Sequence, residues 1–185
     1  DLSGSPLRFV PLAEVERIEI LREPAATLSG ADAVGGGRQI FTKRGEPGLR
    51  ANGFVGYGTQ NTAQVSAGLS GGNEQWRFRL DGNHQSSDSI SARRNASNKD
   101  ADRDPYRNTG GGASPSFRRA QGHEIGLSYR RNEGKTYYDS STGTSSFDSR
   151  VLFESEQWQV FTKNRILDNW NSKLHYGEAV DYQNN

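Results

Sequence analysis

The 185-residue sequence contains no cysteine and no methionine, and only 31% of its residues are hydrophobic. Without cysteine, the chain can form neither a disulfide framework nor a zinc–thiolate site. No segment reaches the 18 or so consecutive apolar residues that a membrane-spanning helix needs. Lysine and arginine total 23 against 22 for aspartate and glutamate, so the charge balance does not favour a nucleic-acid partner.

Methionine is missing at position 1 as well, and the chain begins at Asp1 without a signal-peptide pattern. We therefore expect the chain to be an internal piece of a longer protein. A processed mature domain is the alternative.

Sequence patterns typical of enzymes are scarce. The three histidines, His84, His123 and His175, lie in separate segments without the spacing of a metal triad. The glycine-rich string GADAVGGGRQ (30–39) lacks the Lys-Ser/Thr ending of a phosphate-binding loop. We also expect no nucleophile elbow, and hence no catalytic site.

The first quarter of the chain predicts a compact unit of two short strands. Residues 15–22 alternate around Ile18 and Ile20, a pattern typical of a half-buried strand. The string PAATLS (24–29) suits a short helical turn, and the three glycines at 35–37 allow a tight return into a second strand at 38–44. The turn GEPG (45–48) marks a predicted domain boundary.

The rest of the chain alternates with a period of two. The clearest strand is 76–85, where Trp76, Phe78 and Leu80 face one way while Arg77, Arg79 and Asp81 face the other. Together with this one, about seven strands are expected, at 50–58, 63–71, 76–85, 106–119, 124–130, 157–163 and 170–176, of which 106–119 has the weakest pattern.

The predicted connections favour an outer-membrane β-barrel. Apart from the first turn, short and long connections alternate, as in barrels that have tight turns at one end and long loops at the other. Aromatic residues at the expected strand ends suit the two membrane interfaces: Trp76, Tyr129, Trp158, Trp170 and Tyr176. A soluble antiparallel sheet with one buried face has the same alternation and remains an alternative.

The string PLAEVERIEILREPAATLSGADAVGGGRQIFTKRG (11–45) resembles the end of the plug domain of TonB-dependent outer-membrane receptors. The strings DRDPYRNT, GHEIGLSYRRNEGKTYYD and TKNRILDNWNSKLHYG resemble the first barrel strands of the cobalamin-receptor branch. Glu23, Ser29, Gly37 and Arg38 depart from the family pattern in the plug.

The resemblance implies a mainly β fold with two parts. Residues 1–47 would be the C-terminal part of a plug domain, and residues 48–185 would be about seven antiparallel meander strands of a transmembrane β-barrel. Plugged outer-membrane transporters have about 22 strands, so these would form only a fragment of the wall, which we expect not to fold stably by itself.

Acidic residues in the two long predicted loops are candidate calcium ligands, because calcium prefers several oxygen ligands on flexible loops. The resemblance to cobalamin receptors, which bind calcium through loop aspartates, implies a ligand set of Asp88, Asp102, Asp104, Tyr138, Asp139 and Asp148. Solvation of exposed loops is the alternative role for these carboxylates. In the plug part, the resemblance implies that Arg22 contacts the barrel wall.

The resemblance implies active transport across the outer membrane of a Gram-negative bacterium. Its partners would be a TonB-type energy-coupling protein, outer-membrane lipid, and a large scarce ligand. A cobalamin-type corrinoid is the first expectation for the ligand, and an iron-siderophore is the alternative. A non-transporting, calcium-dependent binding or adhesion module is a further alternative from another functional class.

Overall fold

The computed structural model describes residues 15–21, 37–42, 47–90, 103–138 and 149–184. The chain divides into two compact units, Asp1–Lys43 and Arg44–Asn185. The predicted boundary at 47/48 stays a prediction. In the ranges given above, no helix has the length and apolar character to cross a membrane.

The first unit contains a two-stranded antiparallel ribbon of β1 (Val15–Leu21) and β2 (Gly37–Thr42), as the sequence predicts. Ile18 and Ile20 are nevertheless exposed, so the expected half-burial of this strand is wrong for the side chains described. A two-stranded ribbon cannot by itself cover either of its faces. Arg17 donates to Glu19 over 2.7 Å, and this hydrogen bond raises the pKa of the guanidinium.

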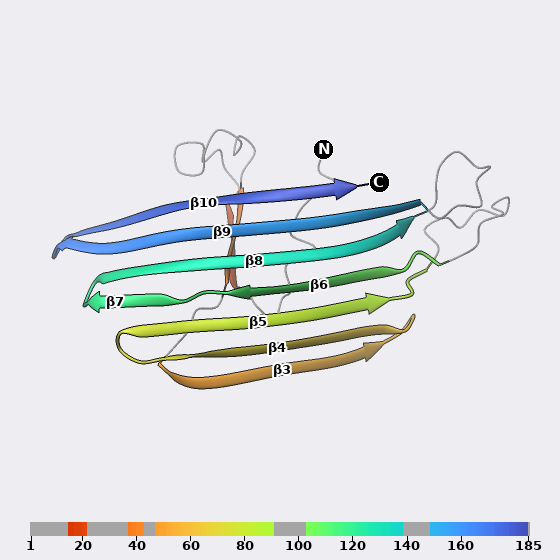
Figure 1. The fold of residues 1–185 in the computed structure, drawn as a ribbon, viewed down its shortest axis with the longest axis horizontal. Coiled ribbons are helices and arrows are strands. Elements are labelled where there is room, and N and C mark those ends of the chain that lie inside the picture. The colour runs from red at the N-terminus through yellow and green to blue at the C-terminus, as the bar shows by residue number, and fades with distance from the viewer. Residues whose placement is uncertain (1–14, 22–36, 43–46, 91–102, 139–148, 185) are drawn as a thin grey trace. The chain divides into compact units, whose positions relative to one another are not determined.

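The second unit is one antiparallel meander (Figure 1). Its strands are β3 (Gly48–Gly58), β4 (Thr62–Gly72), β5 (Trp76–Ser87), β6 (Tyr106–Ala113), β7 (Ser116–Ala120), β8 (His123–Tyr138), β9 (Ser149–Leu167) and β10 (Trp170–Asn184). Consecutive strands pair as neighbours, except that β6 and β7 share one position between β5 and β8.

The shared position of β6 and β7 confirms the predicted strand at 106–119, with one interruption. Pro115 has no N–H to donate to the ladder. Backbone hydrogen bonds continue on both sides of the break, because Arg79 and Ser114 exchange a pair of 3.2 and 2.8 Å and Leu127 N–H donates to the Pro115 carbonyl at 3.0 Å. The seven predicted strands therefore correspond to seven positions in the sheet.

The turns follow from local chemistry. Between β3 and β4, Gln60 and Asn61 both have positive φ, and Thr62 N–H donates to the Thr59 carbonyl at 3.1 Å. This is the geometry of a tight hairpin turn whose twist suits the flanking strands. The three turns at the opposite end, at 73–75, 121–122 and 168–169, are displaced stepwise from β4 to β10 (Figure 1).

Three strands extend beyond their predicted limits. β8 continues to Tyr138, β9 begins at Ser149, and β10 continues to Asn184. Tyr129, Trp158 and Tyr176 therefore lie inside strands, and their predicted placement at strand ends is wrong. In β8 and β9 the added segments carry charged residues where the alternation predicts apolar ones, so their sequence does not indicate a strand. The continuous pairing between β8 and β9 shows that both are strands.

Gly72, beside the turn at 73–75, generates a prediction about stability. It has φ of +150°, and a Cβ there would meet the Trp76 carbonyl and approach the Arg77 Cα to 2.8 Å. Because these are backbone atoms that cannot move aside, we expect Gly72→Ala to lower the free energy of unfolding by about 1–3 kcal/mol. Urea unfolding of the protein in lipid vesicles, followed by tryptophan fluorescence, measures this change.

Gly53→Ala is the matched control, since a Cβ at Gly53 would meet only the Ser66 carbonyl, at 3.7 Å. We expect a change within about 0.5 kcal/mol there. Equal losses for the two substitutions would show that the backbone at Gly72 imposes no special constraint.

Candidate functional site

The two faces of the large sheet have an inverted pattern of burial. On the apolar face, which carries Trp76, Phe78 and Leu80, large side chains are exposed; Val65, Leu69, Leu80, Ile125 and Leu127 are examples. On the polar face, which carries Arg77, Arg79 and Asp81, the buried residues include Ser66, Ser70, Arg79, Asn108 and Asn132. A soluble sheet buries its apolar face, so this arrangement suits a sheet whose apolar side meets lipid.

Aromatic residues form two lines across the apolar face, and both lines are inclined to the hydrogen-bonded rows. The row that starts at Tyr57 on β3 ends at Asn184 on β10, two residues from Tyr182. Tyr176, on the same face and beside the row of Tyr129 and Trp158, lies eight residues nearer the short turns. The row from Trp76 on β5 reaches Leu174 on β10, and Trp170 lies four residues nearer the turns.

The displacements from Tyr57 to Tyr176 and from Trp76 to Trp170 give the strand tilt at which the two residues of each pair would lie level. Six strand steps separate β3 from β10 and four separate β5 from β10, so the lines move by about 1.0–1.3 residues per strand. With about 3.3 Å per residue and about 4.8 Å between strands, both lines become level when the strands tilt by roughly 35–42°. Transmembrane barrels tilt their strands by a similar angle and place aromatic residues at both interfaces.

Charged residues on the apolar face lie beyond the line of Tyr129 and Trp158, on the side of the long loops. Arg131 is 2.8 Å from Glu154 and 3.7 Å from Glu133, and all three side chains are well exposed. A charged side chain in a hydrocarbon layer is costly, so a lipid-facing belt on this face would end between Tyr129 and Arg131 on β8.

The polar face carries a buried ion cluster. Asp81 on β5 accepts from Arg79 Nε at 3.2 Å, and its other oxygen lies 3.7 Å from Arg130 on β8. The side chains of Arg79 and Asp81 are each 6% exposed. The strand between them contributes Gly112, whose missing Cβ would lie 3.5 Å from the Asp81 Oδ2. Gly112 therefore leaves the space through which Arg130 reaches the carboxylate.

A polar row adjoins this cluster. Asn132 lies over Gly110, where a Cβ would collide with its amide oxygen, and Asn83 approaches the same point to 3.2 Å. Within the described ranges, four buried oxygens have no hydrogen-bond partner: Ser66 Oγ, Asp81 Oδ2, Asn108 Oδ1 and Asn132 Oδ1. Unpaired buried acceptors are unusual in folded proteins, and they mark this face as one that meets further donors such as water or another surface.

Of the predicted calcium ligands, Asp88, Asp104 and Tyr138 are described, and all three lie at the long-loop end of the sheet. The Asp88 carboxylate accepts from Asn61 at 2.7 Å and from Arg103 at 3.1 Å. Asp88 N–H also donates to the Gln60 carbonyl at 2.9 Å, which ties the start of the long loop to the β3–β4 turn.

The described ranges do not bring three acidic or histidine side chains together in a metal-binding group. Asp102, Asp139, Asp148 and the predicted plug residue Arg22 lie outside the described residues. The calcium set and the role of Arg22 therefore stay predictions.

The expectation that the sequence has no nucleophile-elbow string is wrong, because GLSGG (68–72) has the G-x-S-x-G spacing. This string lies inside β4, with Ser70 buried on the polar face, whereas a nucleophile elbow requires a strand-to-helix turn. The geometry therefore gives Ser70 no catalytic arrangement.

Solved structures of siderophore receptors match the chain over nearly its whole length. The siderophore receptor PirA from Acinetobacter baumannii matches 95% of the chain with 17% identity and a TM-score of 0.76. The ferric enterobactin receptor PfeA from Pseudomonas aeruginosa, in complex with enterobactin, matches 91% with 23% identity and a TM-score of 0.71. The chain has the fold of part of these receptors.

A third structure, the siderophore receptor PiuA from Acinetobacter baumannii, matches 92% of the chain with 17% identity and a TM-score of 0.69. The chain spans about 27–28% of the length of these receptors. No family model matches the sequence. The likeness confirms the predicted class, an antiparallel meander of the kind found in receptor barrels.

The ion cluster on the polar face generates a second prediction. Asp81→Asn leaves Arg79 and Arg130 buried without a carboxylate, so we expect the free energy of unfolding to fall by about 3–5 kcal/mol. Urea unfolding of the protein in lipid vesicles measures the loss.

Glu133→Gln is the matched control, because it removes one exposed carboxylate from Arg131. An exposed pair contributes at most about 1 kcal/mol. If Asp81→Asn costs no more than Glu133→Gln, the cluster does not stabilise the wall.

Proposed function

We propose that the chain is part of a TonB-dependent outer-membrane receptor that takes up a ferric siderophore in a Gram-negative bacterium. The observation that carries the proposal is the inverted sheet, with its exposed apolar face and inclined aromatic lines on one side and a buried ion cluster on the other. The match to siderophore receptors and the plug-like string at 11–45 support the same assignment.

The charge of the polar face supports an anionic ligand. From β3 to β8, its described cations outnumber its carboxylates: Arg50, Arg77, Arg79, Arg118 and Arg130 against Asp81 and Glu124. A wall lined by one sign of charge attracts ligands of the opposite sign. Ferric complexes of catecholate-type chelators are anions, so a siderophore suits this wall better than a corrinoid.

In this proposal, transport requires no bond chemistry by the chain. The ligand is captured at the long-loop side, and an energy-coupling protein does work on the plug to release it. Binding and conformational change then supply the whole function. The wall's contribution is a stable, polar lining, which the Arg79–Asp81–Arg130 cluster provides.

In this proposal, calcium would bind only at the long loops. Asp88 already accepts from Asn61 and Arg103, so a cation that used this carboxylate would have to displace Arg103. Calcium would otherwise bind oxygens contributed by Asp102, Asp104, Tyr138, Asp139 and Asp148. A calcium-dependent adhesion module on a soluble sheet is disfavoured, because such a sheet would leave its apolar face in water.

Ligand uptake tests the proposal. The protein is produced in the outer membrane of a Gram-negative host that lacks its own siderophore and cobalamin receptors. We expect uptake of iron-55 supplied as ferric enterobactin, and loss of that uptake, with binding retained, in a host without the energy-coupling protein. Parallel samples with calcium or a calcium chelator report whether the loops need the cation.

Radiolabelled cobalamin is the matched ligand. Uptake of cobalamin without uptake of iron would show that the ligand is a corrinoid and not a siderophore. If the protein reaches the outer membrane and takes up neither ligand, the transport assignment is wrong. A protein that purifies as a monomer without detergent would favour the soluble module instead.

A further inference from the structure

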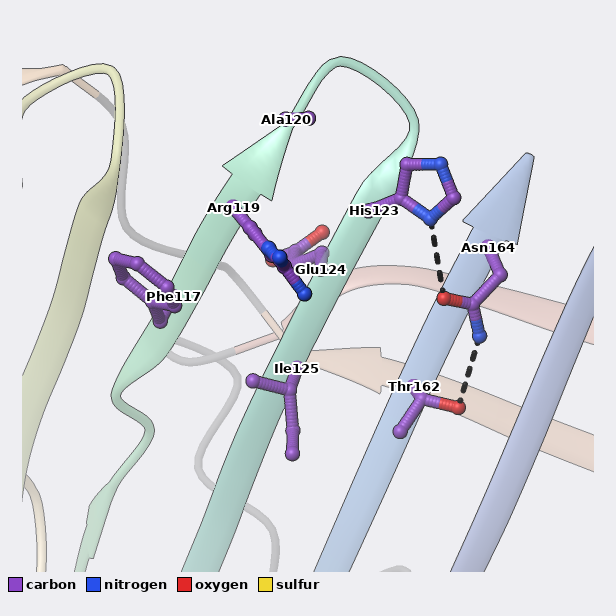
Figure 2. A pocket seen from close by; sticks show the side chains of 8 residues that line it. All are labelled: Phe117, Arg119, Ala120, His123, Glu124, Ile125, Thr162 and Asn164. Carbon is purple, nitrogen blue, oxygen red and sulfur yellow. Dashed lines mark hydrogen bonds between the residues drawn. The ribbon is translucent and has the colours of Figure 1, made fainter. Parts of the chain in front are cut away.

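A hollow opens on the apolar face at the short-turn end of the sheet (Figure 2). Its lining comes from β7, β8 and β9: Phe117, Arg119, Ala120, His123, Glu124, Ile125, Thr162 and Asn164. The hollow combines an apolar part, at Phe117 and Ile125, with a polar part nearer the turns.

A β-bulge places the cation in this hollow. The pairing of β7 with β8 shifts between Arg118 and Ala120, so that Arg119 and Ala120 together stand opposite His123. Bulges commonly redirect side chains at the edge of a barrel. Figure 2 shows Arg119 extending from β7 toward β8, between Phe117 and His123.

In the described part of the chain, no carboxylate pairs with Arg119. The nearest acidic residue in the chain, Glu124, belongs to the polar face by strand alternation and is bound by Lys163 at 3.1 Å. The hollow therefore offers a guanidinium whose charge is not neutralised by the sheet. Guanidinium groups bind phosphate through two parallel hydrogen bonds, which makes phosphate the fitting anion.

The polar wall opposite Arg119 is held in place by side-chain hydrogen bonds. His123 Nδ1 donates to Asn164 Oδ1 at 3.3 Å, and Asn164 Nδ2 donates to Thr162 Oγ1 at 3.4 Å (Figure 2). These two hydrogen bonds fix the imidazole and the amide at the rim of the hollow.

The depth of the hollow matches a lipid headgroup. Trp76 contacts Phe117 with ring centroids 4.6 Å apart and ring planes tilted by 45°, and Phe117 pairs with Ile125 in the same row. Trp76 belongs to the aromatic line at the short-turn interface. Arg119 and His123 lie one step nearer the turns than this row, where a phospholipid carries its phosphate.

A second hollow on the same face provides a contrast. It lies toward the long loops, and its lining includes Arg107 and Lys135 but also Glu133 and Glu154. Carboxylates therefore balance the cations there, and Glu154 is already bound by Arg131 at 2.8 Å. Of these two hollows in the described ranges, the one at Arg119 has a guanidinium that no carboxylate pairs with.

We propose that the hollow around Arg119 binds the phosphate of a phospholipid from the membrane leaflet at the short-turn side. Arg119 binds the phosphate oxygens, His123 and Asn164 form the polar rim, and Phe117 and Ile125 contact the glycerol and the first acyl methylenes. The inference rests on the proposed membrane location, and it assigns a specific lipid contact to that surface.

Native mass spectrometry of the full receptor in detergent, with added phosphatidylglycerol, tests this site. We expect the wild-type protein to retain one tightly bound lipid, and Arg119→Gln to weaken its binding about fivefold, the effect of one arginine near an anionic lipid surface. Arg119→Lys keeps the charge and is expected to keep most of the affinity.

Arg107→Gln is the matched control, because it removes an exposed cation from the same face near the opposite interface. Equal losses of lipid affinity for Arg107→Gln and Arg119→Gln would show that the lipid is held by general charge attraction, and would overturn the site. Inorganic phosphate alone should not displace the lipid; displacement would show a free-phosphate site instead. A receptor that is stably inserted but retains no lipid would refute the site while leaving the membrane location intact.

Discussion

Successive side chains of a β-strand point to opposite faces, and the rest of this structure depends on that period of two. Because β3 to β10 keep the period through a continuous antiparallel ladder, the chain builds one apolar and one polar face from a composition that is only 31% hydrophobic. A low apolar content is sufficient when only every second residue must meet lipid. Between the edge strands β3 and β10, the same ladder pairs the backbone polar groups, which a hydrocarbon layer would require.

In the proposed membrane location, the inclination of the aromatic lines means that one row of paired residues does not lie at one depth. A row that begins in the apolar belt on β4 would leave it by β8, so that neighbours in one row would face different surroundings. Ala67 and Arg131 share such a row, through Gly82 and Gly111. The apolar and charged residues of this row are therefore consistent with a single tilted wall, although they conflict when the sheet is considered flat. The hollow at Arg119 and the charged pairs at Arg131 lie on opposite sides of this wall's apolar belt.

Strand identity was predictable wherever both faces kept their character. Trp76 to Asp81 alternates without exception and is found as predicted in β5. The ends of β8 and β9 could not be predicted, because beyond Tyr129 the outward residues become charged and the pattern that signals a strand disappears. β6, with three successive glycines, is a strand because β5 and β8 pair with it on both sides.

The contact between Asp81 and Arg130 depends on the register of three neighbouring strands. The spacing of residues along the chain does not give this register, so the contact could not be predicted. For the predicted loop ligands, the topology explains only part of the prediction. It places Asp88, Asp104 and Tyr138 at one end of the sheet, but it does not make them bind one cation together.

The central claim is that the apolar face is a tilted, lipid-facing belt. The chain has no cysteine, so a single introduced thiol reports on one position. The most direct measurement compares Ala67→Cys, Arg131→Cys and Glu156→Cys, three positions of one hydrogen-bonded row, for reaction with a membrane-impermeant maleimide in intact outer membranes. A tilted belt predicts that the thiol at position 67 is protected until the protein is unfolded, while those at 131 and 156 react readily. Equal reaction at all three positions, or fastest reaction at position 67, would contradict the membrane-spanning wall.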